Sequence, residues 1–254
     1  MENPALFDLP PAAASWHSGR RIGFDLETTG RDPRTARIVT AAVVEYHAQD
    51  AAEAGNATAQ QDAEAQPSTP RVVEWLVDPG VEIPAEASAV HGISTDYARR
   101  HGTAAAEAVP QILHRIVEEL DAGTPVVIFN APYDLSVLAA EAQRYGADLP
   151  RARPIIDPLV LDKQVDRFRR GKRTLGHMAD HYGVVLDDAH SAAPDAKAAV
   201  ELADVLAQRH RQLQIPAEEL HDLQIGWKAE QAASLQEYFR KTRPDAHVDP
   251  RWPM

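Results

Sequence analysis

The chain has 254 residues, a net charge of −12 at pH 7 and no cysteine, so its size suits one large domain, with or without appendages, and disulfides and cysteine-ligated zinc are excluded. No apolar run approaches the ~20 residues of a membrane span, and the N-terminus lacks the basic start and apolar core of a signal peptide. We therefore expect a cytoplasmic protein without a membrane partner.

Three strands are predicted in the first third of the chain, at residues 20–26, 37–47 and 71–77, from runs of apolar and β-branched residues. Residues 1–19 are rich in proline and alanine, which predicts a flexible leader. Residues 48–70 carry only acidic charges and few large apolar groups. We expect this segment to be a disordered insertion at the tip of the hairpin.

Helices dominate from residue 104 onward, because apolar residues there recur at helical spacing. They are predicted at residues 104–121, 132–145, 174–181, 194–211 and 216–241. Two further strands are predicted between them: the wholly apolar Pro125–Phe129, as expected of a strand buried on both faces, and the shorter Arg153–Ile156. Asp157 follows as a predicted N-cap, with Pro158 at the first helical position.

Meandering strands followed by strands that alternate with helices predict a mixed α/β fold, here a five-stranded sheet flanked by helices. The first strand is expected at the centre, with the site at its C-terminal end. We expect one domain over residues 20–212 and a C-terminal helix and tail over residues 213–254. That helix carries Trp227 and Phe239, and packing against the domain explains its apolar stripe better than binding a partner does.

The first candidate site residues are Asp25 and Glu27, in the segment FDLETTG at the end of the first strand. Alternate strand residues project to one face, so both carboxylates point the same way, while Phe24 and Leu26 point into the opposite layer. Two like charges this close raise each other's pKa, and a divalent cation removes that repulsion. The pair therefore predicts a metal site.

Two more acids are predicted at helix starts. Asp134, in NAPYD, follows the apolar fourth strand, and Asp195, in HSAAPDA, opens the helix at residues 194–211. The helix dipole stabilises an acid there without any function, so each is a weak signal alone. His190 precedes Asp195 by five residues, and a neutral imidazole above a metal site can take a proton from water. An oxygen-only cage of four carboxylates suits Mg²⁺ or Mn²⁺.

The segments FDLETTG, NAPYD and HSAAPDA resemble the three exonuclease motifs of the DEDDh branch of the DnaQ-like 3′–5′ exonucleases, in the same order and with similar gaps. The resemblance covers roughly residues 20–210, and VHGIS (Val90–Ser94) resembles the family's segment between the first two motifs. One departure is Pro132-Tyr133 before Asp134, where the family often has a phenylalanine and no proline.

The resemblance implies a ribonuclease H-like sheet and metal-dependent 3′–5′ hydrolysis of terminal phosphodiesters, which releases nucleoside 5′-monophosphates. Single-stranded 3′ ends are the expected substrate, with DNA favoured. A polymerase, or another replication or repair protein, is a possible partner in a separate chain. An RNA-specific exoribonuclease and a catalytically inactive module that binds nucleic acid or a polymerase remain open as alternatives.

The same resemblance implies a role for each motif residue. Asp25 would bridge two Mg²⁺ or Mn²⁺ ions. Glu27 and Asp195 would complete the ion that carries the attacking water, and Asp134 would serve the second ion. His190 would be the general base.

Contacts to the terminal nucleotide are expected from Thr28, His91, Ile93, Lys172 and Arg173. Each has a structural alternative: a turn for the first three, and a solvated surface for the two basic residues. Residues 163–173 hold six basic side chains against one acid, in a chain whose overall charge argues against gripping a long duplex. This stretch predicts phosphate binding or a solvated face about equally.

Overall fold

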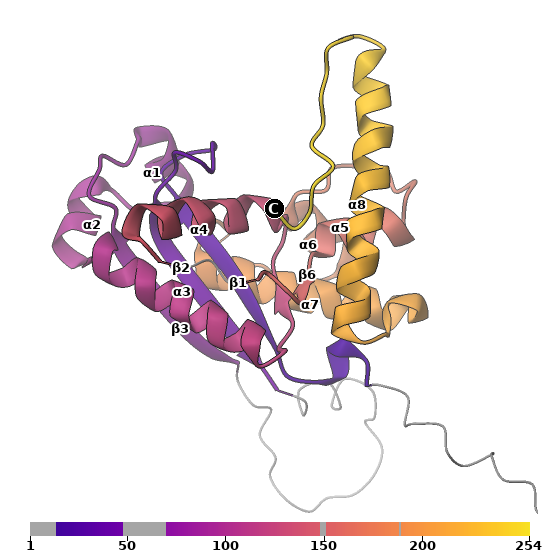
Figure 1. The fold of residues 1–254 in the computed structure, drawn as a ribbon, viewed down its shortest axis with the longest axis horizontal. Helices are drawn as coiled ribbons and strands as arrows, with labels where there is room; N and C mark the ends of the chain where they lie inside the picture. The colour runs from indigo at the N-terminus through magenta and orange to yellow at the C-terminus, as the bar shows by residue number, and fades with distance from the viewer. Residues whose placement is uncertain (1–13, 48–69, 148–150, 188) are drawn as a thin grey trace, which may run out of the picture.

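A mixed six-stranded sheet forms the centre of the protein (Figure 1). The computed structural model describes residues 14–47, 70–147, 151–187 and 189–254. Most of the predicted leader and all but one residue of the predicted insertion at 48–70 lie outside these residues. The strands are β1 (Arg21–Thr28), β2 (Ile38–Tyr46), β3 (Arg71–Asp78), β4 (Thr103–Ala104), β5 (Val126–Val127) and β6 (Ile155–Ile156).

The strand order is β4-β3-β2-β1-β5-β6, which confirms the mixed α/β fold and the central place of the first strand. β1 and β3 each pair with β2 in the antiparallel sense, and the remaining pairs are parallel. The sequence predicted five strands, and β4 is the sixth. Two residues leave no periodic signal. Gly102 permits the pairing, because a Cβ there would lie 2.6 Å from the backbone nitrogen of Asp78.

Eight α-helices surround the sheet in the described part of the chain. They are α1 (Ala85–His91), α2 (Thr95–His101), α3 (Ala105–Asp121), α4 (Pro132–Tyr145), α5 (Pro158–Val165), α6 (Leu175–Tyr182), α7 (Ala192–Arg209) and α8 (Ala217–Arg240). The two that the sequence did not predict, α1 and α2, have seven residues each, too few for an apolar stripe. None of the described helices combines the length and apolar character that a membrane crossing requires.

Two hydrophobic cores lie on opposite faces of the sheet. Ile22, Phe24 and Leu26 of β1 pack into the core beneath α3 and α4, which cover one face (Figure 1). Helix α7, with α5 and α6, forms the second core on the other face. Side chains therefore alternate along β1, and the positions between the apolar ones face α7.

The C-terminal extension packs on the domain through both its helix and its tail. Helix α8 lies beside α5 and β6, and the chain then turns back along it (Figure 1). Trp227 packs against both cores, as predicted, whereas Phe239 belongs to neither and lies under the Arg243 guanidinium. Trp252 is buried near the end of the chain. Trp16 is also buried, and its indole Nε1 donates to the Leu213 carbonyl over 2.9 Å. The packed chain therefore begins before the predicted boundary at residue 20.

Helix α7 approaches β1 very closely at Gly23. A Cβ at Gly23 would lie 2.3 Å from the Ala196 carbonyl oxygen and 2.8 Å from a methyl carbon of Val200, and a helix backbone cannot yield by so much. We expect Gly23→Ala to push α7 away from β1 and to lower the free energy of unfolding by about 1–3 kcal/mol in urea titrations. Gly226→Ala on α8 is the control, because its Cβ meets nothing within 4 Å. Equal stabilities for the two variants would contradict this packing argument.

Candidate functional site

Asp25 and Glu27 lie on the α7 side of β1, as the strand alternation predicted. Phe24 is fully buried and Leu26 is 5% exposed in the opposite core, whereas both acids keep partial exposure. The close packing at Gly23 sets the distance between this face of β1 and the first turn of α7. The site is therefore built where the central strand and α7 meet.

Asp195 and His190 reach the same place from the start of α7. One ligand atom from each of Glu27, His190 and Asp195 lies within 4.8 Å of the other two. The backbone N–H of His190 donates to Asp195 Oδ1 over 3.4 Å. His190 has φ 72°, a left-handed conformation that costs a non-glycine residue about 1–3 kcal/mol. This turn carries the imidazole back over the carboxylates.

Asp134 joins the site from the first turn of α4. Its side chain is buried, and its Oδ1 accepts a hydrogen bond over 3.1 Å from the backbone N–H of Leu26, which lies between the two acids of β1. This bond fixes the Asp134 carboxyl beside the two acids of β1. The three motifs, far apart in sequence, converge as predicted.

Asp157 and Tyr133 also position this site, and the sequence did not identify that role. Asp157 caps α5, as predicted, through the Leu159 N–H. It also accepts the N–H groups of Asn130 and Ala131 over 3.0 and 3.1 Å, which holds the turn before Asp134. The departure at Tyr133 has a structural role, because its hydroxyl bonds the Thr28 hydroxyl over 2.5 Å and the Gly30 carbonyl.

The electrostatics of the four carboxyls suit a bound cation. Burial is the largest cause of a raised pKa at each of them, Asp25, Glu27, Asp134 and Asp195. The three other acids raise the pKa of Asp25 further, and Asp195 helps to raise the pKa of Glu27 to about 7. Within the described chain, no lysine or arginine forms an ion pair with any of the four. Their oxygens, with one imidazole nearby, fit a hard divalent ion.

Of the expected nucleotide contacts, Thr28 ends β1, His91 ends α1 and Ile93 lies between α1 and α2. Thr28 is buried in the bonds to Gly30 and Tyr133. Burial lowers the pKa of His91, and a hydrogen bond with the Thr28 backbone opposes this effect. The His91 imidazole therefore lies beside the end of β1. Its Nδ1 accepts from the Ile93 N–H over 3.2 Å. Ile93 itself packs against the small core that contains Val39.

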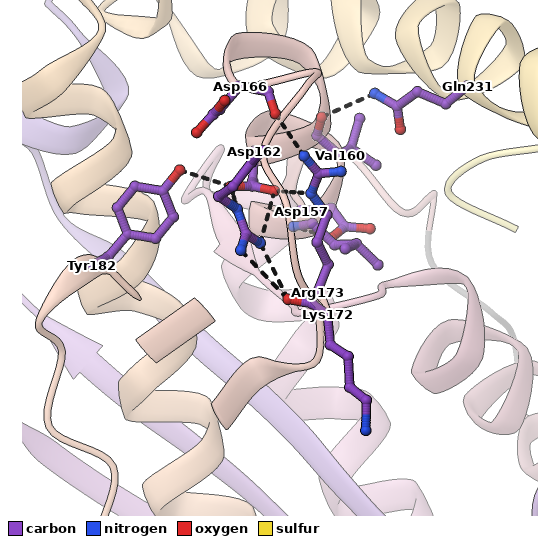
Figure 2. Close-up of polar contacts among 10 residues, drawn as sticks. Asp157, Val160, Asp162, Asp166, Lys172, Arg173, Tyr182 and Gln231 are labelled. Carbon is purple, nitrogen blue, oxygen red and sulfur yellow. Dashed lines mark hydrogen bonds and ion pairs between the residues drawn. The ribbon is translucent and has the colours of Figure 1, made fainter. Parts of the chain in front are cut away.

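The other two expected contacts, Lys172 and Arg173, behave differently from one another. Figure 2 shows Arg173 turned inward, where its Nε donates to Asp162 Oδ2 over 2.6 Å and its Nη2 to the Asp166 carbonyl over 2.5 Å. The Lys172 side chain is exposed and extends away from this cluster (Figure 2). Arg173 is thus committed to a structural ion pair, and Lys172 is free to meet solvent or a ligand.

Comparisons with known proteins identify a family and a fold. The sequence model described as RNase_T, an exonuclease family, matches residues 22–203. The comparison with curated proteins found no match. Among solved structures, one of exonuclease I matches with a TM-score of 0.62 and 18% identity, covering 77% of this chain and 42% of that one.

Two further matches are structures of the same enzyme. Exonuclease I from Methylocaldum szegediense has a TM-score of 0.58 and 20% identity, and E. coli exonuclease I in complex with a dA16 oligonucleotide has 0.60 and 19%. Each match covers 77% of this chain and 42% of the other, so the chain spans less than half the length of these proteins. The likeness confirms the ribonuclease H-like fold.

Proposed function

The chain belongs to the RNase T family of exonucleases, and on that premise we propose that it is a divalent-metal-dependent 3′–5′ exonuclease that releases nucleoside 5′-monophosphates. The observation that carries the proposal is the convergence of Glu27, His190 and Asp195 within 4.8 Å, next to Asp25 and Asp134. Four acids in repulsive contact destabilise a fold unless something binds there. A binding module without catalysis would not need an imidazole over the carboxylates.

The residues present fit two Mg²⁺ or Mn²⁺ ions. When bound, the ions orient the attacking water, make it more acidic and stabilise charge on the leaving 3′ oxygen. Asp25, whose pKa all three other acids raise, would hold both ions. Glu27 and Asp195 would hold the ion that carries the attacking water, and Asp134, which the Leu26 backbone fixes beside them, would hold the second.

His190 acts as the general base in this proposal. Its ring is exposed, so water reaches it, and the Asp195 carboxylate accepts its backbone N–H, so its position follows that of a metal ligand. A ring nitrogen of the neutral imidazole takes the proton from the attacking water as the phosphodiester bond breaks. The nucleotide then leaves with its 5′ phosphate.

Single-stranded DNA is the substrate that we propose. The E. coli exonuclease I structures with the same fold hold dA16 and dT13 oligonucleotides, and the acidic net charge of this chain suits gripping a strand end better than a long duplex. We also propose that the chain acts in DNA replication or repair, where a polymerase in a separate chain is a possible partner.

A time course on labelled nucleic acid tests the reaction. We would digest single- and double-stranded DNA and RNA carrying a 3′-terminal label, with Mg²⁺ or Mn²⁺ and with EDTA. Label should appear first as mononucleotide, only with metal, and fastest from single-stranded DNA. Labelled fragments of intermediate length at early times would overturn the exonuclease assignment or its polarity.

The raised pKa values predict that metal stabilises the protein more at about pH 8 than at about pH 6. A carboxyl whose pKa is raised on folding, such as Glu27 from 4.5 to about 7, binds protons more tightly in the folded state. This stabilisation is complete below the unfolded pKa and is lost as the pH rises through about 7. The melting temperature in EDTA should fall over this range, and Mn²⁺ should restore it.

Glu27→Gln is the control for that measurement, because it removes the titrating carboxyl. The variant should show a flatter dependence of the melting temperature on pH in EDTA, and a smaller rise with Mn²⁺. If Mn²⁺ raised the melting temperature of the wild type equally at both pH values, the carboxylates would not be the metal site.

A further inference from the structure

A groove of about 800 Å³ lies between the C-terminal end of α5, the loop that follows it and the outer half of α8. Lys163, Arg167 and Phe168 line it from the first side, and Lys228 and Tyr238 line it from α8. The two walls are about sixty residues apart in sequence. None of the five motif residues lines the groove, so it is distinct from the site already described.

The groove concentrates positive charge on an acidic protein. Its lining contains four basic residues and one acid, Glu230, although the chain as a whole carries −12. Of the four, Arg173 is bound to Asp162. Lys163, Arg167 and Lys228 form no ion pair within the described residues. Burial lowers the pKa of Lys163, and the positive charge of Lys228 lowers it further. Three cations without an ion pair, gathered in one groove, attract a polyanion.

Two exposed aromatic rings accompany these cations. Phe168 is 88% exposed and Tyr238 is 65% exposed, although rings of this kind are usually buried. The Arg167 guanidinium lies 5.9 Å from the centre of the Phe168 ring, so a positive charge lies next to an aromatic ring on which a base could stack. Cations interleaved with exposed rings bind single-stranded nucleic acid, whose bases offer their faces, better than a duplex, whose bases are stacked on one another.

The loop that carries Arg167 and Phe168 is held in place from behind. Asp162 is fully buried and binds Arg169, Arg173 and the Tyr182 hydroxyl, the last over 2.7 Å (Figure 2). On the facing wall, the Gln231 side chain donates to the Val160 carbonyl over 3.1 Å and ties α8 to α5 (Figure 2). Both walls are therefore fixed before any ligand binds, which lowers the entropic cost of binding.

Helix α5 connects the groove to the site. Asp157 caps α5 and also holds the turn before Asp134. Helix α5 has only eight residues, so it begins beside that turn and its last residues, Lys163 and Gln164, line the groove. A strand whose 3′ end lay at the carboxylates could thus continue past the start of α5 toward α8.

We propose that this groove binds the single strand on the 5′ side of the nucleotide being removed, with Lys163, Arg167 and Lys228 on its phosphates and Phe168 and Tyr238 stacked on its bases. This inference rests on the proposed function and adds where the rest of the substrate lies. It also assigns a role to the C-terminal helix, because α8 supplies one wall. A longer single strand should therefore bind more tightly and be cut more efficiently than a very short one.

Binding without catalysis gives the first test. We would measure fluorescence anisotropy of labelled oligo(dT), about 15 nucleotides long, with the full chain in EDTA. Arg167→Glu combined with Lys228→Glu should weaken binding at least tenfold and lower the slope of log K against log salt by about 1.4, for two lost phosphate contacts. Arg211→Glu, an exposed cation outside the groove, is the single-charge control and should change neither.

Phe168 tests stacking separately from charge. Phe168→Ala should weaken oligo(dT) binding by about fivefold or more, and Phe168→Trp should preserve it, because stacking needs only a ring face. The side chain is almost fully exposed, so neither change threatens the fold. Wild-type affinity in the charge-reversed double variant, or no binding by the wild type, would overturn the inference.

Hydrolysis distinguishes failure of the groove from failure of the proposed function. For each protein we would compare kcat/KM on the long oligo(dT) with kcat/KM on a trinucleotide, in Mn²⁺. The ratio should exceed one in the wild type and fall at least tenfold in the double variant, but not in Arg211→Glu. An unchanged ratio in an active double variant would exclude the groove. Tight, groove-dependent binding without hydrolysis of either substrate would exclude the nuclease and leave the groove standing.

Discussion

Asp25→Asn is expected to remove metal-dependent nuclease activity while the protein stays folded. Asp25 lies among the three other acids and is proposed to bridge both ions, so losing its charge weakens both at once. Stabilisation by metal of the charges that develop during phosphodiester hydrolysis is worth several kcal/mol, so kcat/KM should fall by about three decades or more. Asp195→Asn should act similarly. The measurement is release of 3′-terminal mononucleotide in Mg²⁺ and in Mn²⁺.

The stability of the same variant gives an independent reading. Replacing a half-buried, repelled carboxylate by an amide of the same shape relieves a cost, so Asp25→Asn should melt at a higher temperature than the wild type in EDTA at about pH 8. Asp121→Asn, an exposed acid at the end of α3, should change neither activity nor melting. EDTA-sensitive hydrolysis at the wild-type rate in Asp25→Asn would exclude this carboxylate cluster as the active site.

His190→Asn is expected to slow turnover by about two to four decades, the usual loss when a general base is removed. Asparagine tolerates the left-handed backbone conformation that His190 adopts at φ 72°, so the turn before α7 should be retained. The amide cannot take a proton. His190→Ala should lose the same activity and, in addition, some stability, because alanine does not favour that conformation.

A measurement of metal binding distinguishes a general base from a metal ligand at position 190. His190 lies within 4.8 Å of Glu27 and Asp195, a separation that would also allow it to coordinate an ion. Calorimetric titration with Mn²⁺ should give the same affinity for His190→Asn and the wild type, while Asp195→Asn binds more weakly. A parallel loss of Mn²⁺ affinity and activity in His190→Asn would assign the imidazole to the metal and leave the base unidentified.

Much of the candidate site follows from local rules that the sequence carries. Asp25 and Glu27 share a face because strand side chains alternate. For the same reason Phe24 and Leu26 point the other way, into the opposite core. Asp134 and Asp195 lie in first turns of helices, where capping and the helix dipole favour acids. Their order along the chain was sufficient to indicate the family.

Other parts of the site depend on contacts between residues far apart in the chain, so no local sequence pattern predicts them. Asp157 looked like an N-cap and is one, yet it also holds the turn before Asp134, because β5 and β6 end side by side. Tyr133 looked like a departure from the family and instead ties α4 to the turn after β1. Arg173 looked free to bind phosphate, and Asp162 holds it.

The sequence by itself determined which elements form, which acids share a face and which chemistry the chain carries, because backbone propensity, capping and residue type act within a few neighbours. Only the tertiary structure decided how those pieces meet. It placed Asp134 on the Leu26 backbone, raised the pKa of the four carboxyls by burial and set α8 opposite the basic loop. Burial and electrostatic repulsion arise between segments that the chain separates by a hundred residues or more, and packing alone brings them together.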